Sequence, residues 1–236
     1  METGMQNSDV VLNALFIDQV YERLLDSISF GELKPGMRVR QSKLAEQLGV
    51  SRQPISHALQ LLKHQGLVSD AGKQGVQVAP LNAAYLMQLH TVRTVLENQA
   101  ALLAVERIQS GAATSEEIEA LTQALRKGQR ATQNLAPLSE LIRADHEFHV
   151  ALYRLSGNTV IEQIMLGQWP HIMRSMLAVL EYGKIQAAPT VWEEHARITA
   201  FIVAGDAVAA ATACTAHLQR ASHDLQSRLQ QLQQAA

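Results

Sequence analysis

The sequence has a single cysteine, Cys214, and only 4% aromatic residues in 236 positions. One cysteine excludes an intramolecular disulfide and favours a reducing compartment, so we expect a cytoplasmic protein. Few aromatics imply a core of leucine, alanine, valine and isoleucine. The smoothest run of small and apolar residues, Ala207–Ala213, falls far short of the roughly 18–20 residues that span a membrane, and the polar start Met1–Asp9 differs from a signal peptide. We therefore expect no membrane partner.

A strong net charge is also lacking, because the formal charge is −2 at pH 7. This value excludes a uniformly basic nucleic-acid coat and an acidic disordered chain. This average conceals a difference in charge between two parts of the chain. Residues 34–73 hold seven basic and two acidic residues, a net charge of +5, whereas the chain from Leu81 onward holds 12 basic and 14 acidic residues. This asymmetry indicates a polyanionic partner for the N-terminal part alone.

Glycine and proline divide the chain at the same place. They recur closely up to Pro80, and long stretches rich in alanine, leucine, glutamine and glutamate follow. The first pattern is typical of short elements joined by turns, and the second of helices. We therefore predict a mainly α protein with two domains. Residues 10–80 form a small mixed domain, whose motifs predict a winged helix-turn-helix, and residues 81–236 form an all-α bundle of six or seven helices.

The helix-turn-helix prediction rests on residues 41–59, QSKLAEQLGVSRQPISHAL. Ala45 is small enough for two helices to cross closely, Gly49 permits a left-handed turn, and Ile55 anchors the second helix in the core. Two short apolar stretches around residues 70–74 are typical of a wing. An αα-hairpin with a basic solvated face is the alternative interpretation. The exposed start of the second helix would meet base edges and phosphates through Ser51, Arg52, Gln53, Ser56 and His57.

In the helical part, four groups stand apart from the other histidines: Asp145, His149, His195 and His217. The first two are four residues apart and therefore share one helix face. The other two fall on separate predicted helices, among small or apolar neighbours. Three neutral imidazoles and one carboxylate suit a divalent transition metal, Zn²⁺ or Ni²⁺ above all. The alternative is that the two later histidines are ordinary helix residues and that Asp145 pairs with Arg143 or Arg154.

The N-terminal motifs resemble the winged-helix domain of GntR-type transcription regulators. The similarity covers residues 18–80 and rests on LAEQLGVSRQP at residues 44–54 and on the GLV and GV of residues 66–68 and 75–76. It implies a homodimer that binds an inverted repeat in double-stranded DNA. Ser56 stands where the family usually has arginine, and His57 and Gln41 where it has an acid, so we expect a different operator. The predicted DNA-binding residues are Arg40, Ser42, Lys43, Ser51, Arg52, Gln53, Pro54, Ser56, His57, Gly72 and Lys73.

Residues 86–228 are similar to the helical effector domain, the FCD domain, of the FadR-type subgroup of that family. The similarity rests on Asp145-x3-His149, on LSGN at residues 155–158, on Glu194-His195 and on His217. Many members hold a metal with an aspartate and three histidines in these places, inside a cavity that binds a small organic acid. The resemblance thus implies the metal ligands Asp145, His149, His195 and His217, together with a small carboxylic acid as effector.

A carboxylate bound in such a cavity needs a buried cation beside it. Arg93 is the first candidate, and a helix-surface ion pair with Glu97 is the alternative role for that arginine. Further candidates for effector binding are Arg143, Asn158 and Arg174, and for Asn158 a cap on the following helix is the alternative role.

These expectations combine into a DNA-binding transcription regulator, a repressor, whose operator affinity is controlled by the acid bound beside the metal. A metal-responsive regulator without an organic effector is the alternative. A metal-dependent hydrolase is a more remote one, because such a ligand set can activate water. The sequence has no HExxH motif, nucleophile elbow or phosphate loop, so we expect no enzymatic activity.

Overall fold

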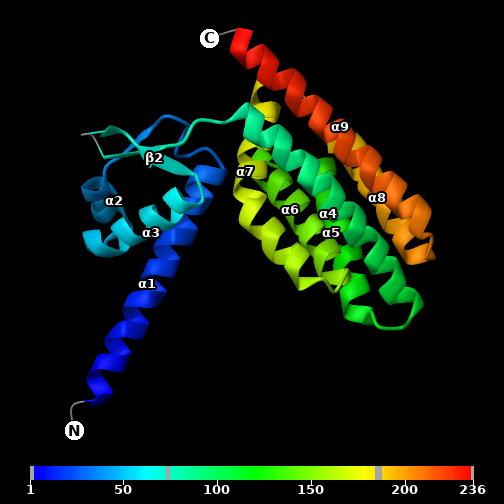
Figure 1. Ribbon diagram of the computed structural model, residues 1–236, viewed down its shortest axis with the longest axis horizontal. Coiled ribbons are helices and arrows are strands. Elements are labelled where there is room, and N and C mark those ends of the chain that lie inside the picture. The colour runs from blue at the N-terminus through cyan, green and yellow to red at the C-terminus, as the bar shows by residue number, and fades with distance from the viewer. Residues whose placement is uncertain (1–2, 73–74, 184–187, 235–236) are drawn as a thin grey trace. The chain divides into compact units, whose positions relative to one another are not determined.

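A computed structural model describes residues 3–72, 75–183 and 188–234 of the chain. The chain divides into two compact units, residues 1–81 and residues 82–236. In Figure 1 the first unit combines helices with a small sheet, and the second is a bundle of long helices.

The helices of the first unit are α1 (Thr3–Ser29), α2 (Gln41–Leu48) and α3 (Arg52–His64). Val20, Leu24 and Ile28 recur every four residues on α1, so they share one face of that helix. This face is buried in a common core with Ile55 of α3. The turn between α2 and α3 is left-handed at Gly49, which has a φ of +66° that glycine adopts without a Cβ clash. The predicted helix-turn-helix is therefore confirmed.

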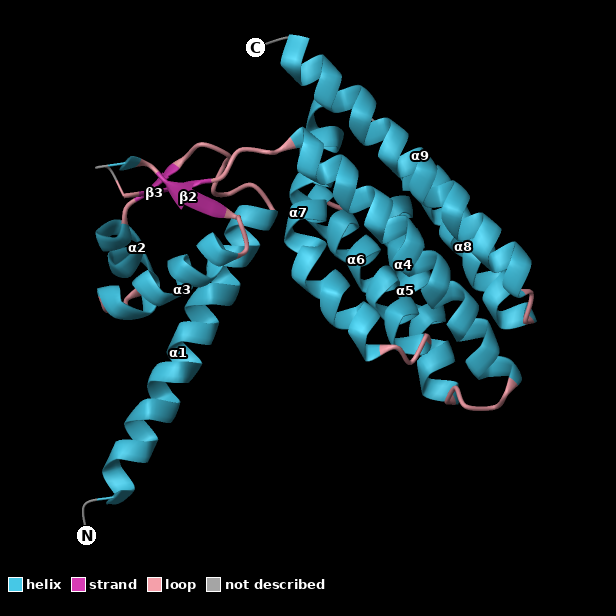
Figure 2. Cartoon of the chain, in the orientation of Figure 1, coloured by secondary structure: helices cyan, strands magenta, loops and turns pink. Residues whose placement is uncertain are grey.

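A three-stranded antiparallel sheet of order β1-β3-β2 completes this unit (Figure 2). Its strands are β1 (Arg38–Val39), β2 (Val68–Asp70) and β3 (Val76–Val78). Val68 lies opposite Val78, and both side chains are buried. The two strands of the predicted wing are thus present as β2 and β3. The sequence did not predict β1, because two residues are too few to show an alternating pattern.

The described part of the second unit consists of helices alone. They are α4 (Ala83–Gln109), α5 (Ser115–Gln133), α6 (Leu138–Leu155), α7 (Thr159–Gly183), α8 (Ala188–Ala204) and α9 (Ala207–Gln234). The most extensive packing is between α4 and α9, between α5 and α6, and between α8 and α9. The predicted mainly α fold with its helical bundle is confirmed. Among the described helices, none is both long and apolar enough to cross a membrane.

Local sequence sets the junction between α6 and α7. Gly157 has a φ of +69° and ends α6 in the left-handed conformation. The side chain of Asn158 then accepts hydrogen bonds from the backbone N–H groups of Val160 and Ile161, at 3.1 and 3.2 Å, and caps α7. The C-terminal end of α6, the helix with two of the predicted metal ligands, is therefore fixed by adjacent residues.

Gly128 of α5 lies against Trp192 of α8. A Cβ atom at this position would lie 1.9 Å from the ring of Trp192, so only glycine fits without a shift of that ring. Trp192 is buried and lies edge-on to the His195 ring, with 4.9 Å between the centroids. The close approach of α5 thus supports one side of the predicted metal site.

Candidate DNA-binding face and candidate metal centre

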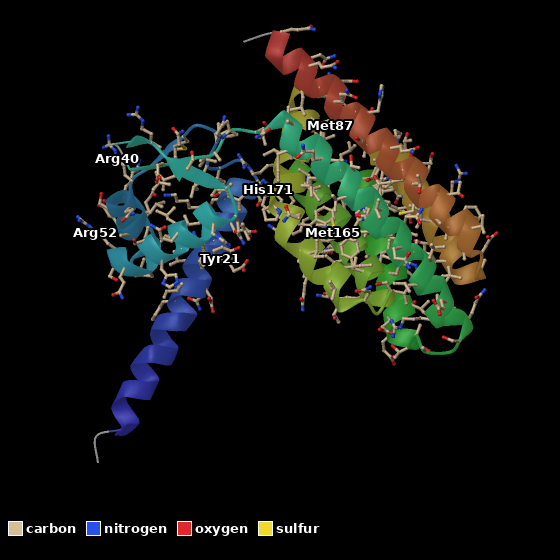
Figure 3. The ribbon with its side chains drawn as sticks, viewed as in Figure 1. Tyr21, Arg40, Arg52, Met87, Met165 and His171 are labelled. Carbon is tan, nitrogen blue, oxygen red and sulfur yellow. The ribbon has the colours of Figure 1, made fainter. Side chains whose placement is uncertain are left out.

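The first turns of α3 present polar side chains to solvent. Arg52, Gln53 and His57 are exposed, and Ser51 occupies the N-cap position. Figure 3 shows Arg52 and Arg40 on the same side of this unit. Exposed polar and cationic groups at the start of the second helix are what insertion into a major groove requires.

The remaining predicted DNA-binding residues differ in exposure. Ser42, Lys43 and Gly72 are exposed, and Ser56 is half-buried. Pro54 is buried in the first turn of α3, where its missing N–H costs little, and its contact with DNA stays a prediction. Lys73 lies outside the described residues.

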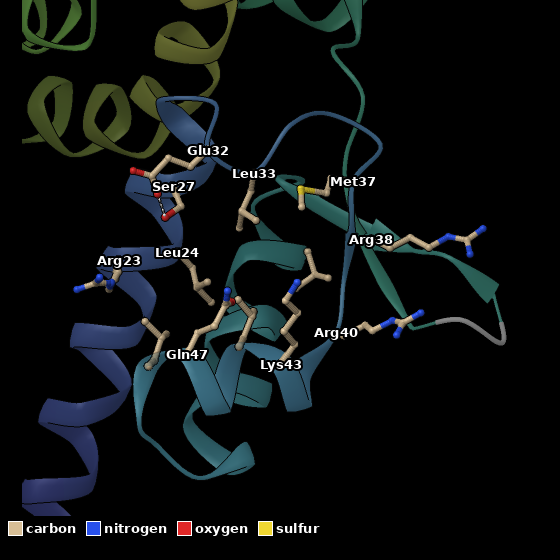
Figure 4. A pocket seen from close by; sticks show the side chains of 13 residues that line it. Arg23, Leu24, Ser27, Glu32, Leu33, Met37, Arg38, Arg40, Lys43 and Gln47 are labelled. Carbon is tan, nitrogen blue, oxygen red and sulfur yellow. Dashed lines mark hydrogen bonds between the residues drawn. The ribbon is translucent and has the colours of Figure 1, made fainter. Parts of the chain in front are cut away.

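Cations border a crevice in the same unit (Figure 4). Arg23, Arg38, Arg40 and Lys43 line it, and none of them forms an ion pair with a residue in the described ranges. Arg38 and Arg40 extend to the same side in Figure 4. The sequence did not single out Arg38, and its place beside Arg40 enlarges the basic surface next to the wing.

In the second unit, Asp145 and His149 of α6 meet His195 of α8 and His217 of α9. All four side chains are buried. The Nε2 atoms of His195 and His217 are 3.3 Å apart. The carboxylate oxygens of Asp145 lie 3.8 Å from Nε2 of His149 and 3.7 Å from Nε2 of His195. One ring nitrogen from each histidine lies within 4.8 Å of the other two, so three helices bring four potential ligands to one point.

Two carboxylates lie against two of these rings. Oε2 of Glu194 lies 2.7 Å from Nδ1 of His217, and Oε2 of Glu97 lies 2.9 Å from Nδ1 of His149. The first contact is a hydrogen bond, and because an ionised carboxylate only accepts hydrogen bonds, Nδ1 of His217 carries the proton and the lone pair of its Nε2 faces the shared point. In the second contact neither Nδ1 of His149 nor Oε2 of Glu97 has a hydrogen-bond partner among the described residues. The oxygens of Asp145 face the same point. Such a cluster of lone pairs and negative charge is unfavourable alone and fits a metal cation.

Burial keeps the rings of His195 and His217 neutral, which metal binding requires. It lowers the pKa of His195 well below its ordinary value and also lowers the pKa of His217. Burial raises the pKa of Glu194, but hydrogen bonds from His217 and Arg220 outweigh this effect and bring it to about 2. His195 is held by stacking on Phe148, with ring centroids 4.1 Å apart. Neutral imidazoles beside ionised carboxylates are the protonation states that bind a divalent metal.

A cavity of about 270 Å³ lies beside the four groups, with Asp145, His217 and Arg93 in its wall. Arg93 is 3% exposed, and its Nε donates to Oε1 of Glu97 at 2.6 Å. Its guanidinium also lies over the ring of Trp169, 4.8 Å from the centroid. Its Nη2 has no hydrogen-bond partner among the described residues. Arg93 therefore forms the ion pair with Glu97, but buried rather than on the surface, and keeps one buried donor for a ligand.

The other predicted effector-binding residues are absent from the described wall of this cavity. Arg143 is exposed on α6, and Asn158 caps α7. Arg174 is buried in α7, where burial lowers its pKa to about 10. Arg154, one of the alternative partners of Asp145, pairs with Glu162 at 2.9 Å instead.

Sequence reasoning did not assign two residues, Glu97 and Arg220, to this site. Glu97 is fully buried, accepts hydrogen bonds from Arg93 and from the hydroxyl of Tyr153, and lies 2.9 Å from Nδ1 of His149. Arg220 lines the cavity, and its Nε and Nη2 each donate to Glu194 at 2.6 Å. Each of these two residues has an oppositely charged residue four positions away on its own helix, and the sequence held no other signal for either of them.

Two family models match the chain. The model of bacterial regulatory proteins of the gntR family matches residues 16–78, and the FCD domain model matches residues 88–220. Among curated proteins, the HTH-type transcriptional regulator LutR of Bacillus subtilis (strain 168) is 31% identical over 209 residues, which cover 81% of this chain and 92% of LutR. The uncharacterized HTH-type transcriptional regulator YdhC of the same organism is 30% identical over 182 residues, 76% of this chain and 77% of YdhC.

Solved structures show the same architecture. McbR/YncC of Escherichia coli superposes with a TM-score of 0.78 at 25% identity, over 91% of this chain and 98% of McbR. A GntR regulator from Rhodococcus sp. RHA1 shares the fold, with a TM-score of 0.76 at 21% identity, over 89% of this chain and 96% of that one. The matched families and relatives are transcription regulators and not enzymes, so the hydrolase alternative is set aside. The chain belongs to the GntR family of DNA-binding transcription regulators, in the subgroup that carries a C-terminal FCD domain.

Proposed function

We propose that this regulator is a repressor that acts as a homodimer on an inverted repeat. A small organic acid, bound beside a divalent metal in the helical unit, controls its affinity for that operator. One observation carries the proposal. Asp145 and three histidine nitrogens converge beside a cavity whose wall also holds the unsatisfied donor of Arg93.

Asp145, His149, His195 and His217 are the residues that would hold the metal. Three imidazoles and one carboxylate suit Zn²⁺ or Ni²⁺. The hydrogen bond between Glu194 and Nδ1 of His217 would fix the tautomer of that ring, as outer carboxylates do around metal-binding histidines, and Glu97 lies beside Nδ1 of His149. When bound, the metal supplies a Lewis acid that attracts an oxygen of the effector carboxylate.

Arg93 provides a second contact for the same carboxylate. Its guanidinium is held in place by Glu97 and by the ring of Trp169, so little side-chain freedom is lost when a ligand binds. A charge-assisted hydrogen bond from its Nη2 would satisfy a buried donor and orient the acid.

Helix α4 offers the route from this site to the DNA-binding unit. Strand β3 ends at Val78 and α4 begins at Ala83, and Arg93 and Glu97 lie on this helix. An acid that binds one arrangement of α4 better than another shifts the population of that arrangement. A tenfold change in operator affinity requires a coupling free energy of about 1.4 kcal/mol.

The test uses an operator that the metal-loaded protein selects from a random duplex pool. A thermal-shift panel of mono-, di- and hydroxycarboxylates identifies an acid, since a ligand at 100 times its Kd adds about 2.7 kcal/mol of stability. Fluorescence anisotropy then measures the operator Kd, which we expect the acid to raise at least tenfold. If the metal alone changes the operator Kd and no acid does, the chain is a metal-responsive regulator and acid control is wrong.

Arg93→Ala and Arg93→Lys test the contact with the acid. We expect both to raise the Kd of the acid at least tenfold in isothermal titration, while the metal content stays unchanged by elemental analysis. Arg93→Lys keeps a cation beside Glu97 and so limits damage to the buried pair. Arg126→Ala is the control, because that arginine is exposed on α5 and pairs only loosely with Glu119, at 3.6 Å. Retained affinity in both Arg93 variants would remove this residue from the site.

A further inference from the structure

The cavity beside the candidate metal centre is lined by two arginines that differ in how their donors are used. Arg93 keeps Nη2 without a hydrogen-bond partner among the described residues. In Arg220, Nε and Nη2 each donate to Glu194 at 2.6 Å, and Nη1 donates to Asp224 at 3.0 Å. Glu194 and Asp224 therefore already neutralise the second cation of the described wall.

The rest of the described wall is mostly apolar and carries no further cation. His90 is buried in it, and burial lowers the pKa of its ring to about 4, so the ring is neutral at pH 7. The polar neutral residues are Ser175 and Thr190. The apolar side chains come from three helices, and they are Met176, Val179, Leu180, Val191, Ala221 and Leu225.

Among the described residues, the charges around the cavity balance once a divalent metal is bound and before any acid enters. Two arginines and a divalent metal carry as much positive charge as four carboxylates carry negative charge, those of Glu97, Asp145, Glu194 and Asp224. One bound carboxylate adds a single negative charge, which the metal and Arg93 can contact. A second carboxylate would lie against apolar side chains without a free cation in the described wall, and an unpaired charge in such a place is costly.

Building on the proposed function, we propose that the effector is a monocarboxylate with a short aliphatic tail, and that Asp224 disfavours dicarboxylates by occupying Arg220. The carboxylate binds at the Arg93 end of the cavity, and the tail contacts the apolar wall around Leu180. The volume of about 270 Å³ lies below the roughly 300–1,000 Å³ of pockets for drug-sized ligands, which limits the tail to a few carbons.

Isothermal titration of the full-length, metal-loaded protein with matched acids tests this proposal. Pentanoate and pentanedioate have the same number of carbons and differ by one carboxylate. We expect pentanoate to bind at least tenfold more tightly than pentanedioate. From propanoate to pentanoate, each methylene should tighten the Kd about fourfold, the equivalent of ~0.8 kcal/mol per buried CH₂.

Two variants test the roles given to Asp224 and Leu180. Asp224→Asn removes one of the two negative charges that neutralise Arg220, so the ratio of the pentanedioate Kd to the pentanoate Kd should fall about tenfold. Leu180→Ala removes tail contacts, so the ratio of the propanoate Kd to the pentanoate Kd should fall by about fivefold. Glu193→Gln is the control, because it removes one negative charge from an exposed residue of α8 outside the described wall and should leave both ratios unchanged.

The outcomes separate this inference from the proposed function. Equal or tighter binding of pentanedioate by the unmodified protein, or an unchanged ratio in Asp224→Asn, would overturn the preference for monocarboxylates and leave acid control standing. Failure of every acid to bind the metal-loaded protein would overturn the proposed function itself.

Discussion

In the DNA-binding unit (residues 1–81) arginine side chains are exposed, whereas in the effector unit (residues 82–236) two arginines form ion pairs with carboxylates. Arg40 and Arg52 form no ion pair within the described chain, and Arg93 and Arg220 are bound by Glu97 and by Glu194. Exposed cations attract a polyanion over a distance and are screened by salt. A buried, pre-oriented cation such as Arg93 is instead suited to one small group in a fixed place. The same residue type is thus suited to two kinds of anion, according to its burial and its partners.

The largest effect is expected when one of the four candidate metal ligands is removed from the buried site. We expect His217→Ala to weaken metal binding by more than about 100-fold, because loss of an outer-sphere partner alone costs about 10–100-fold. Competition with a chelator measures this change. His223→Ala on the same helix is the matched control, since His223 is exposed and lies outside the cluster. Equal loss in both variants would contradict a site centred on His217.

A second prediction concerns the exposed side of the comparison. Arg52→Ala should abolish the operator shift in a gel assay, because loss of a base-edge contact costs about 1–3 kcal/mol. Lys127→Ala is the control: this lysine belongs to the effector unit and is paired with Glu147 at 2.6 Å. Unchanged operator affinity in Arg52→Ala would show that α3 does not read DNA through this residue.

The buried site also depends on close packing, which the exposed face does not need. Gly128→Ala should destabilise the protein by about 1–3 kcal/mol, because the new methyl group overlaps the Trp192 ring behind His195. Gly167→Ala is the matched helix variant, with no atom within 4 Å of the added Cβ, and should stabilise by about 0.5–1 kcal/mol. Chemical denaturation measures both changes. The same sign in both variants would contradict the role given to the contact with Trp192.

The smallest expected effect concerns the salt dependence of DNA binding. Arg40→Ala removes one exposed cation beside the wing and should reduce the slope of log Kd against log salt for DNA by about 0.9, uniformly across sequences. Anisotropy titrations at several salt concentrations measure the slope. An unchanged slope would place Arg40 away from the phosphates.

Local patterns predicted those parts of the molecule that depend on local geometry. Ala45, Gly49 and Ile55 fix the crossing of two adjacent helices, so their spacing revealed the helix-turn-helix. Asp145 and His149 could be paired because four residues span one helical turn. These features are encoded within a few residues of each other.

Contacts between helices far apart in the chain left no such pattern. The approach of Glu97 to His149 and of Arg220 to Glu194 depends on how α4, α6, α8 and α9 pack, and many spacings are compatible with it. For Asn158 the sequence left two roles open, a place in the effector pocket and a cap on the following helix, and its side chain caps α7.

The most direct test of the central claim is reciprocity between acid and DNA. Isothermal titration of pentanoate into the metal-loaded protein, with and without saturating selected operator, measures the coupling from the side of the acid. Because linkage is symmetric, the Kd of the acid should rise on DNA by the same factor, at least tenfold, by which the acid raises the operator Kd. Identical acid affinities with and without operator would contradict control of DNA binding from the buried site.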